Sequence, residues 1–175
     1  MNAVVLAVLQ AGAWMATIAG LFFVSRQLKL ATKSYIDLHD WNRRNAAQTL
    51  FFDFNLNFSM TGVQSALNYT NLKLPIEVGA LQEKFKEHPQ LQLDVAKLLN
   101  FFECLAVGIQ NGVYDKQIIE VGFKGLMQHG WLVFQKYIQY RQVDTIYKSW
   151  ETFSKVIHTW EAEEKAFQER QHTGK

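Results

Sequence analysis

The side chains best suited to chemistry lie in the short segment RRNAAQ, residues 43–48. Two adjacent guanidinium groups, Arg43 and Arg44, followed by the amide of Asn45, could bind phosphate in RNA or in lipid headgroups. A plainer interpretation is that both arginines follow a membrane segment, where they face headgroups or pair with acidic side chains. We favour that plainer interpretation, because Gln48, Thr49 and Leu50 stand where a histidine would be needed to carry a proton in RNA cleavage.

Elsewhere the sequence holds no constellation of metal-binding or nucleophilic residues. The five histidines are not paired at the spacing of metal ligands, and His158 with Glu161 predicts only a solvated or locally hydrogen-bonded pair. The one cysteine, Cys104, lies in an apolar stretch, so we expect a buried and inert thiol. The glycines within residues 122–130 fit a helical pattern and favour close helix packing over phosphate binding. We therefore expect no catalytic residue, no metal, no cofactor and no enzymatic activity.

The N-terminal residues 1–25 carry no charged side chain. A helix that crosses the hydrocarbon core needs about 20 mostly apolar residues, and residues 3–24 meet that length. Basic residues follow this run and do not precede it: Arg26, Lys29 and Lys33. By the positive-inside rule the sequence predicts a retained single-pass transmembrane helix over residues 1–25, with its N-terminus outside. The remainder would then lie in the cytoplasm; a cleaved signal peptide and a buried core helix are the alternatives.

Small residues within this run predict contact with other helices. Gly12, Ala16 and Gly20 are spaced four apart, so they share one helix face on which two backbones can approach closely in lipid. Gln10 would lie near the middle of the span, where a partner across a helix contact would stabilise it. These four residues are our candidate interface for a homo-oligomer, although glycine and alanine are also common in membrane helices generally.

The remaining sequence predicts an all-α body. Residues 26–50 lack proline and glycine, so the membrane helix should continue into the cytoplasm, and we interpret the alternating phenylalanines of residues 51–60 as helix. A break at Gly62 and the residues after it should precede a short helix over residues 76–87, which His88-Pro89 ends. Three longer helices then carry apolar stripes at helical spacing, near residues 91–109, 119–137 and 146–167.

These stripes must bury one another, so we expect an antiparallel helical bundle over residues 26–160. Residues 161–175 should form a charged tail that frays. The composition is 49% hydrophobic and 14% aromatic, enough for a core, and the formal net charge of +2 is too small to argue for nucleic acid. Asn111-Gly112 and Asp115 have the chemistry of a helix end and a helix start, respectively.

One stretch resembles a widespread bacterial family of unknown function. It is LLNFFECLAVGIQNGVYDKQIIEVGFKG, residues 98–125, and the upstream WNRRNAAQTLFFDF is similar to that family's Trp/Arg-containing helix. The residues that match the pattern are Asn100, Phe101, Phe102, Glu103, Gly112, Tyr114 and Asp115. The resemblance implies a membrane helix joined to a helical body, and it implies no activity.

Two looser resemblances suggest a biological setting. Arg44-Asn45 is similar to the opening of the motif of HEPN ribonucleases, but Gln48, Thr49 and Leu50 stand where those enzymes carry histidine. The architecture resembles the membrane-pore accessory protein of RNA-targeting CRISPR systems. We expect a non-enzymatic, homo-oligomeric membrane protein that serves as an accessory or effector, with the bilayer and a protein of an antiviral defence system as partners and no nucleic acid. The alternatives are a ring-shaped pore that depolarises the membrane and a degenerate HEPN-like RNA-binding or ribonuclease bundle.

Overall fold

The computed structural model describes the backbone of residues 3–57, 61–144 and 148–173. For residues 3–13, 15–17, 19, 51–57, 61, 144, 172 and 173 it describes the backbone alone. The described residues form helices α1 to α6 and one 3-10 turn, and no strand occurs among them, which confirms the expected all-α class. They divide into two compact units, residues 1–42 and residues 43–175.

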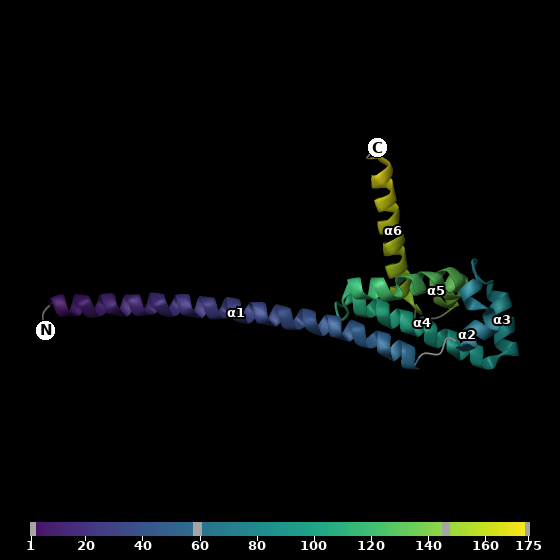
Figure 1. The fold of residues 1–175 in the computed structure, drawn as a ribbon, viewed down its shortest axis with the longest axis horizontal. Helices are drawn as coiled ribbons and strands as arrows, with labels where there is room; N and C mark the ends of the chain where they lie inside the picture. The colour runs from purple at the N-terminus through teal and green to yellow at the C-terminus, as the bar shows by residue number, and fades with distance from the viewer. Residues whose placement is uncertain (1–2, 58–60, 145–147, 174–175) are drawn as a thin grey trace. The chain divides into compact units, whose positions relative to one another are not determined.

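The first unit is the N-terminal part of helix α1, which runs from Ala3 to Asn57. As predicted, the helix continues past the uncharged run without a break, because no proline interrupts it and Gly20 is its last glycine. The residues with alternating phenylalanines are helical as far as Asn57, and residues 58–60 lie outside the described residues. Figure 1 shows α1 as a single continuous helix.

Among the described residues, no helix is both long enough and apolar enough to cross a membrane. Much of the span predicted over residues 1–25, including the side chains of Gln10, Gly12 and Ala16, lies outside the residues whose side chains are described. Gly20 is described: it is exposed, and a methyl group built on it meets no atom within 4 Å.

The second unit is a helical bundle in which α4 has the central place. Helices α2 (Thr61–Leu67), α3 (Val78–Glu87), α5 (Lys116–Asp144) and α6 (Glu151–Thr173) all contact α4 (Pro89–Gln110). The turn η1 (Tyr69–Asn71) follows α2. Helix α3 ends at Glu87 and α4 begins at Pro89, so His88-Pro89 ends the short helix as predicted. Proline fits the first position of α4 because its missing N–H would have no partner there in any case.

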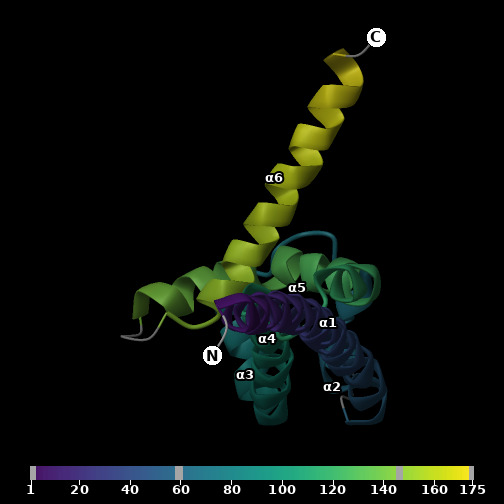
Figure 2. The ribbon, with the colours of Figure 1, turned by 90° about the vertical axis from the view of Figure 1, so that its left-hand side faces the viewer.

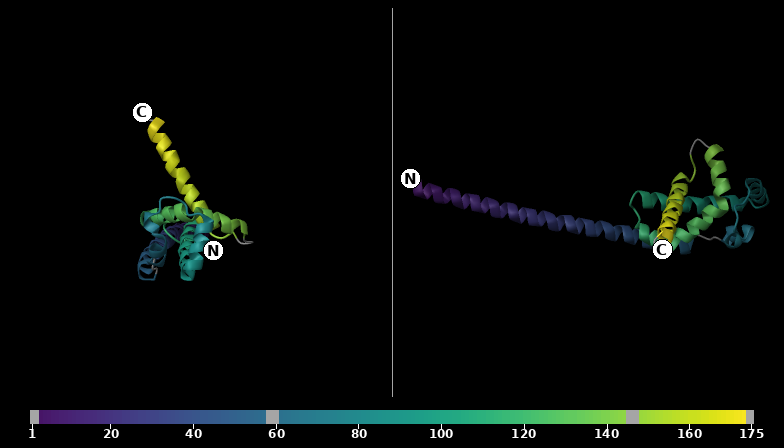
Figure 3. Two further views of the ribbon diagram at one scale, coloured as in Figure 1. Left: turned by 90° about the vertical axis from the view of Figure 1, so that its right-hand side faces the viewer. Right: turned by 90° about the horizontal axis from the view of Figure 1, so that it is seen from above.

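The apolar stripes predicted from the sequence do form the core. Side chains of α4, α5 and α6 meet in one cluster, in which Phe102, Phe134, Phe153 and Trp160 are among the largest fully buried groups. Fully burying a large apolar side chain contributes about 1.5–3 kcal/mol, so each of these aromatic residues stabilises the bundle substantially. The apolar stripe of α6 leaves the core after Trp160, and residues 161–171 are exposed. The first of these residues still contact α5 on the surface, because Lys116 lies 3.1 Å from Glu163 and Lys124 lies 2.7 Å from Glu164. Beyond them the end of α6 extends away from the other bundle helices (Figures 2 and 3).

Several local predictions were wrong. Gly62 lies inside α2, where it allows the helix to approach Asp94, whereas the expected break before α3 is present at residues 68–77, which contain only the turn η1. Cys104 is exposed, because α4 presents it on the face opposite the stripe. Among the tryptophans, Trp14 and Trp41 are exposed, and Trp131, Trp150 and Trp160 are buried.

Of the glycines within residues 122–130, only Gly130 serves close packing. Gly122 and Gly125 are exposed, and a methyl group on Gly125 would meet no atom within 4 Å. A methyl group on Gly130 would overlap the ring of Phe102. Position on the helix face, and not membership of a glycine-rich stretch, therefore decides which glycine allows α5 to approach α4.

Candidate functional site

Arg44, the candidate phosphate ligand, is paired with an acidic side chain. Its Nε lies 3.5 Å from Oδ2 of Asp115, and the Arg44 side chain is 66% exposed. The other carboxylate oxygen of Asp115 accepts the backbone N–H groups of Gln117 at 3.0 Å and Ile118 at 3.3 Å, which caps the start of α5 as predicted. Arg44 thus joins α1 to the first turn of α5, and of the contacts expected for it the structure shows the pairing with an acidic side chain.

The neighbours of Arg44 add no catalytic group. Arg43 is half-buried, whereas Asn45 is exposed and its backbone carbonyl accepts the hydroxyl of Thr49 at 2.9 Å. Gln48 is exposed as well. Nothing in this segment supplies an imidazole or carboxylate that could carry a proton beside Arg44.

The other titratable groups singled out from the sequence are also in local contacts. His158 Nδ1 lies 3.1 Å from Oε2 of Glu161, one helical turn away on the surface, and the imidazole packs edge-on against Trp131. Within the described part of the chain, no group of three or more His, Cys, Asp or Glu residues is arranged to hold a metal ion.

Glu103 has a role that the sequence did not reveal: it caps helix α6 from helix α4. Its two carboxylate oxygens accept the backbone N–H groups of Thr152 at 3.2 Å and Phe153 at 2.7 Å. These N–H groups lie in the first turn of α6, where they have no partner within the helix. The negative charge also lies at the positive end of the helix dipole, so the contact is electrostatically favourable. Glu103 therefore fixes where α6 begins on the bundle.

Asn100, one turn before Glu103, holds the residue that precedes α6. Its Oδ1 accepts the indole N–H of Trp150 at 2.8 Å, and Trp150 is 8% exposed. The backbone of Trp150 has φ of 60°, a left-handed conformation that costs energy for any residue with a side chain. The hydrogen bond and the burial of the indole offset that cost, so Asn100 and Glu103 together set the turn into α6.

The remaining motif residues also make structural contacts. Phe102 packs onto Gly130, Gly112 takes φ of 64° at the end of α4, and the ring of Tyr114 lies on Gly108. The left-handed turn at Gly112 favours glycine because a side chain would be strained there. The motif that carries the family resemblance therefore encodes the junction of α4, α5 and α6. The signal in the sequence was the mixture of polar and aromatic residues in a buried helix, which indicates specific hydrogen bonds.

The phenol of Tyr69 is buried in the core, where it cannot exchange a proton with solvent. This complete burial raises the pKa of Tyr69 far above its usual range. The imidazole Nε2 of His129 lies 2.9 Å from the carbonyl oxygen of Tyr69, and the Tyr69 ring stacks on Phe134. Tyr69 thus anchors the turn η1 to helix α5 and has no access to a substrate.

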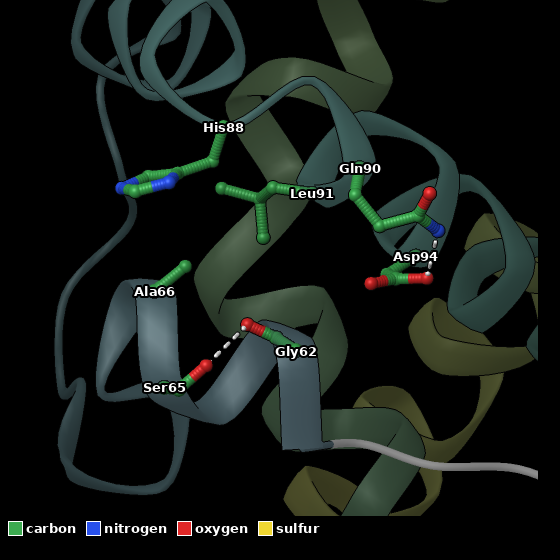
Figure 4. Close-up of a pocket in the computed structure, with 7 residues that line it drawn as sticks. All are labelled: Gly62, Ser65, Ala66, His88, Gln90, Leu91 and Asp94. Carbon is green, nitrogen blue, oxygen red and sulfur yellow. Dashed lines mark hydrogen bonds between the residues drawn. The ribbon is translucent and has the colours of Figure 1, made fainter.

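A hollow of ≈ 260 Å³ lies between α2 and α4. Its lining, drawn in Figure 4, includes serine, histidine and aspartate side chains. The hydroxyl of Ser65 donates to the carbonyl of Gly62 at 3.2 Å, within its own helix. Asp94 accepts the amide of Gln90 at 3.0 Å, and His88 lies on the other side of the hollow (Figure 4). Because a nucleophile needs a base within hydrogen-bond reach, this set is no catalytic triad.

A second hollow, of ≈ 440 Å³, lies beside the turn into α6. Its lining includes Asn100, Tyr137, Arg141 and Trp150. Asn100 and Trp150 bond to each other, and the Tyr137 and Trp150 rings lie 6.0 Å apart. The indole of Trp150 therefore joins α4, through its hydrogen bond to Asn100, to α5, through its ring contact with Tyr137.

Comparison with known proteins gives a family and no activity. A family model described as a domain of unknown function, DUF4760, matches residues 4–160. The chain belongs to this family. The match spans both compact units, and it includes the polar and aromatic motif of α4. No curated protein and no solved structure was found to match the chain. The expected membership of a family of unknown function is confirmed, and the comparisons show no link to HEPN ribonucleases or to CRISPR systems.

Proposed function

We propose that this DUF4760 protein is a non-enzymatic, single-pass membrane protein, in which α1 anchors the helical bundle and brings copies together. The observation that carries the proposal is the N-terminal part of α1. Residues 1–25 have no charge, and the described side chains among them are exposed: Trp14 is 69% exposed, Ile18 64% and Phe22 73%. Exposed apolar area of this extent costs free energy in water, at about 25 cal/mol per Å².

The distribution of these side chains around the helix favours lipid as the covering. Leu21, Phe22, Phe23 and Val24 are consecutive, and each is at least 60% exposed. Successive residues are rotated by about 100° around a helix, so the four side chains surround its whole circumference. A single partner helix would cover one side of that circumference, whereas lipid covers all sides. The proposed span begins in residues 3–13, whose side chains lie outside the described residues.

The charges after the run orient the anchor. Arg26, Lys29 and Lys33 are all exposed on α1 directly after the uncharged residues. Cations gather on the cytoplasmic side of a span, so the N-terminus would lie outside and the bundle in the cytoplasm, at the inner membrane of a bacterium. Gln10, Gly12, Ala16 and Gly20 remain the proposed contact between spans.

The bundle would serve as an accessory or effector that binds a protein partner, in a defence system or another response at the membrane. The support is the end of α6. Residues 161–171 are exposed, and Phe167, with 58% of its area exposed, lies on this extension. This end of α6 lies beyond the residues that pack in the core, and it carries a large exposed aromatic side chain. It therefore offers a surface to which a partner helix could bind.

The anchor is tested by alkaline extraction of membranes from cells that express the full chain. Wild-type protein should stay in the carbonate-resistant pellet. The double variant Trp14→Asp/Ile18→Asp should be released, because each acid near the centre of a span costs about 2.5–3.5 kcal/mol. The control Tyr35→Asp/Leu38→Asp changes equally exposed residues of the same helix beyond the uncharged run, and it should stay in the pellet. Release of the wild-type chain, or retention of the first double variant, would contradict the proposal.

A further inference from the structure

A second feature of α1 lies beyond the uncharged run: a seam of residues spaced alternately three and four apart. The seam comprises Leu21, Val24, Leu28, Ala31, Tyr35, Leu38 and Asn42. This spacing is the heptad repeat of a coiled coil, and it is unbroken over three heptads. The seam is therefore a regular stripe along α1, and it continues past the cations that end the proposed span.

We propose that the seam, from Leu28 to Asn42, pairs with the same seam of a second copy of this chain in a parallel two-stranded coiled coil. The seam is unpartnered in the single chain. Leu28 is 67% exposed, Tyr35 is 70% exposed and Leu38 is 57% exposed. An isolated helix with such a stripe is marginal in water, and most helical stability comes from packing of the apolar face.

The charge pattern argues for an identical copy as the occupant. Every charged residue within residues 26–42 lies at the outer positions of the heptad, away from the seam and its flanking rows: Arg26, Lys29, Lys33, Asp37 and Asp40. The flanking rows hold only Gln27, Thr32, Ser34, His39 and Trp41. Charges in the flanking rows select different partners in coiled coils, and like charges there repel identical copies. Their absence between residues 26 and 42 makes self-pairing free of repulsion.

Two features favour two strands in this coiled coil: the polar residues in the flanking rows, and the asparagine at the C-terminal end of the seam. Coiled coils of more than two strands bury the flanking rows as well, and here Thr32 and Ser34 in those rows are polar. Asn42 occupies the seam at its C-terminal end. An asparagine at such a position bonds to its copy in the other strand, which fixes the register and favours two strands.

The parallel orientation rests on the proposed function. If α1 enters the cytoplasm from a membrane in every copy, the seams run in the same direction from the same surface. Equivalent residues then face each other along the entire seam. In an antiparallel pair, equivalent residues would face each other only at the centre.

Disulfide cross-linking of the full chain in its native membranes tests the seam. In a Cys104→Ser background, the single variants Ala31→Cys and Leu38→Cys should each form dimers under mild oxidation. Lys33→Cys and Asp40→Cys, at outer positions of the same helix, should cross-link at least tenfold more slowly. Equal rates at all four positions, dimers at only one seam position, or cross-linking of a higher oligomer between the spans without dimers at the seam would overturn the proposal.

A matched pair of charge variants gives a second readout, the mass of the detergent-solubilised particle. In a Gly12→Leu/Gly20→Leu background, which removes the proposed contact between spans, Leu28→Glu/Leu38→Glu should convert the dimer to a monomer. Leu30→Glu/Ile36→Glu changes residues that are 60% and 52% exposed at outer positions, and it should leave the dimer intact. A persistent dimer in the seam variant would overturn the proposal.

Carbonate extraction of the same samples separates this inference from the membrane anchor. If the chain stays in the membrane pellet without seam cross-links, the seam is refuted and the anchor stands. If the chain is released from the membrane while seam cross-links persist, the anchor is refuted and self-pairing stands, with its parallel direction shown by the cross-links at both positions.

Discussion

Two glycines of α5 should respond to the same substitution with opposite signs. Gly130 is buried, and a methyl group on it would overlap the ring of Phe102, which is fully buried. Gly125, about one and a half turns earlier, is exposed, and a methyl group on it meets no atom within 4 Å. Both residues lie in the interior of one helix, so the comparison isolates the contact with α4.

The magnitudes follow from two known terms. Replacing glycine by alanine in a helix interior stabilises the protein by roughly 0.5–1 kcal/mol, and Gly125→Ala should gain that amount. Gly130→Ala has the same gain, but overpacking of a core costs about 1–3 kcal/mol. The ring of Phe102 cannot easily move aside, because its centroid lies 5.2 Å from that of Phe153 and 6.2 Å from that of Phe101. We expect a net loss of about 1–2 kcal/mol.

Thermal unfolding of the full chain in detergent provides the assay. The buried indoles of Trp131, Trp150 and Trp160 report unfolding of the bundle through their fluorescence. With about 4 °C per kcal/mol for a unit of this size, Gly125→Ala should raise Tm by about 2–4 °C and Gly130→Ala should lower it by about 4–8 °C. If Gly130→Ala were as stable as Gly125→Ala, the close approach of α5 to α4 at Phe102 would be refuted.

Three further predictions concern polar contacts of the bundle. Glu103→Ala should lower the free energy of unfolding by about 2–3 kcal/mol, because two N–H groups at the start of α6 lose a charged acceptor. Glu103→Gln should lower the free energy of unfolding by less, because its amide oxygen can still accept one of these hydrogen bonds. Equal losses for the two variants in denaturant titrations would contradict the capping role. Asp115→Ala should cost about 1 kcal/mol through the lost cap of α5. Arg44→Ala should change stability by less than about 0.5 kcal/mol, because the Arg44 side chain is 66% exposed to solvent. A loss for Arg44→Ala as large as that for Asp115→Ala would contradict this ranking. The hydrogen bond from Lys124 holds the pKa of Glu164 below its usual value. The small stabilisation of the fold by this contact is therefore present above the ordinary carboxyl pKa and is lost as pH falls through the lowered pKa. NMR titration should show the pKa of Glu164 rising in Lys124→Met, and an unchanged pKa would exclude the contact.

The sequence predicted the periodic parts of the fold well, because burial imposes its period on the residues. The stripes through Leu98 and Phe102 in α4 and through Phe153 and Ile157 in α6 lie in the core as expected. The start of α5 at Asp115 was also predicted, since an N-cap needs only local chemistry.

Contacts between distant residues could not be predicted in the same way. Glu103 and Trp150 are far apart in the sequence from the groups they bind, and no local rule pairs Asn100 with an indole fifty residues later. The exposure of Cys104 was missed because an apolar segment does not reveal which of its faces turns outward. Arg44 does pair with an acid, as one of its expected contacts, but no local pattern distinguishes Asp115 from the other acidic residues as its partner.

Depth profiling of α1 in bilayers tests the membrane anchor most directly. In a Cys104→Ser background, spin labels would be placed singly at residues 14, 18 and 22, and at residues 30, 33 and 37 of the same helix. Labels at the first three positions should show high accessibility to oxygen and low accessibility to a water-soluble nickel chelate, and labels at the last three should show the reverse. Equal access of the nickel chelate to all six positions would contradict the account.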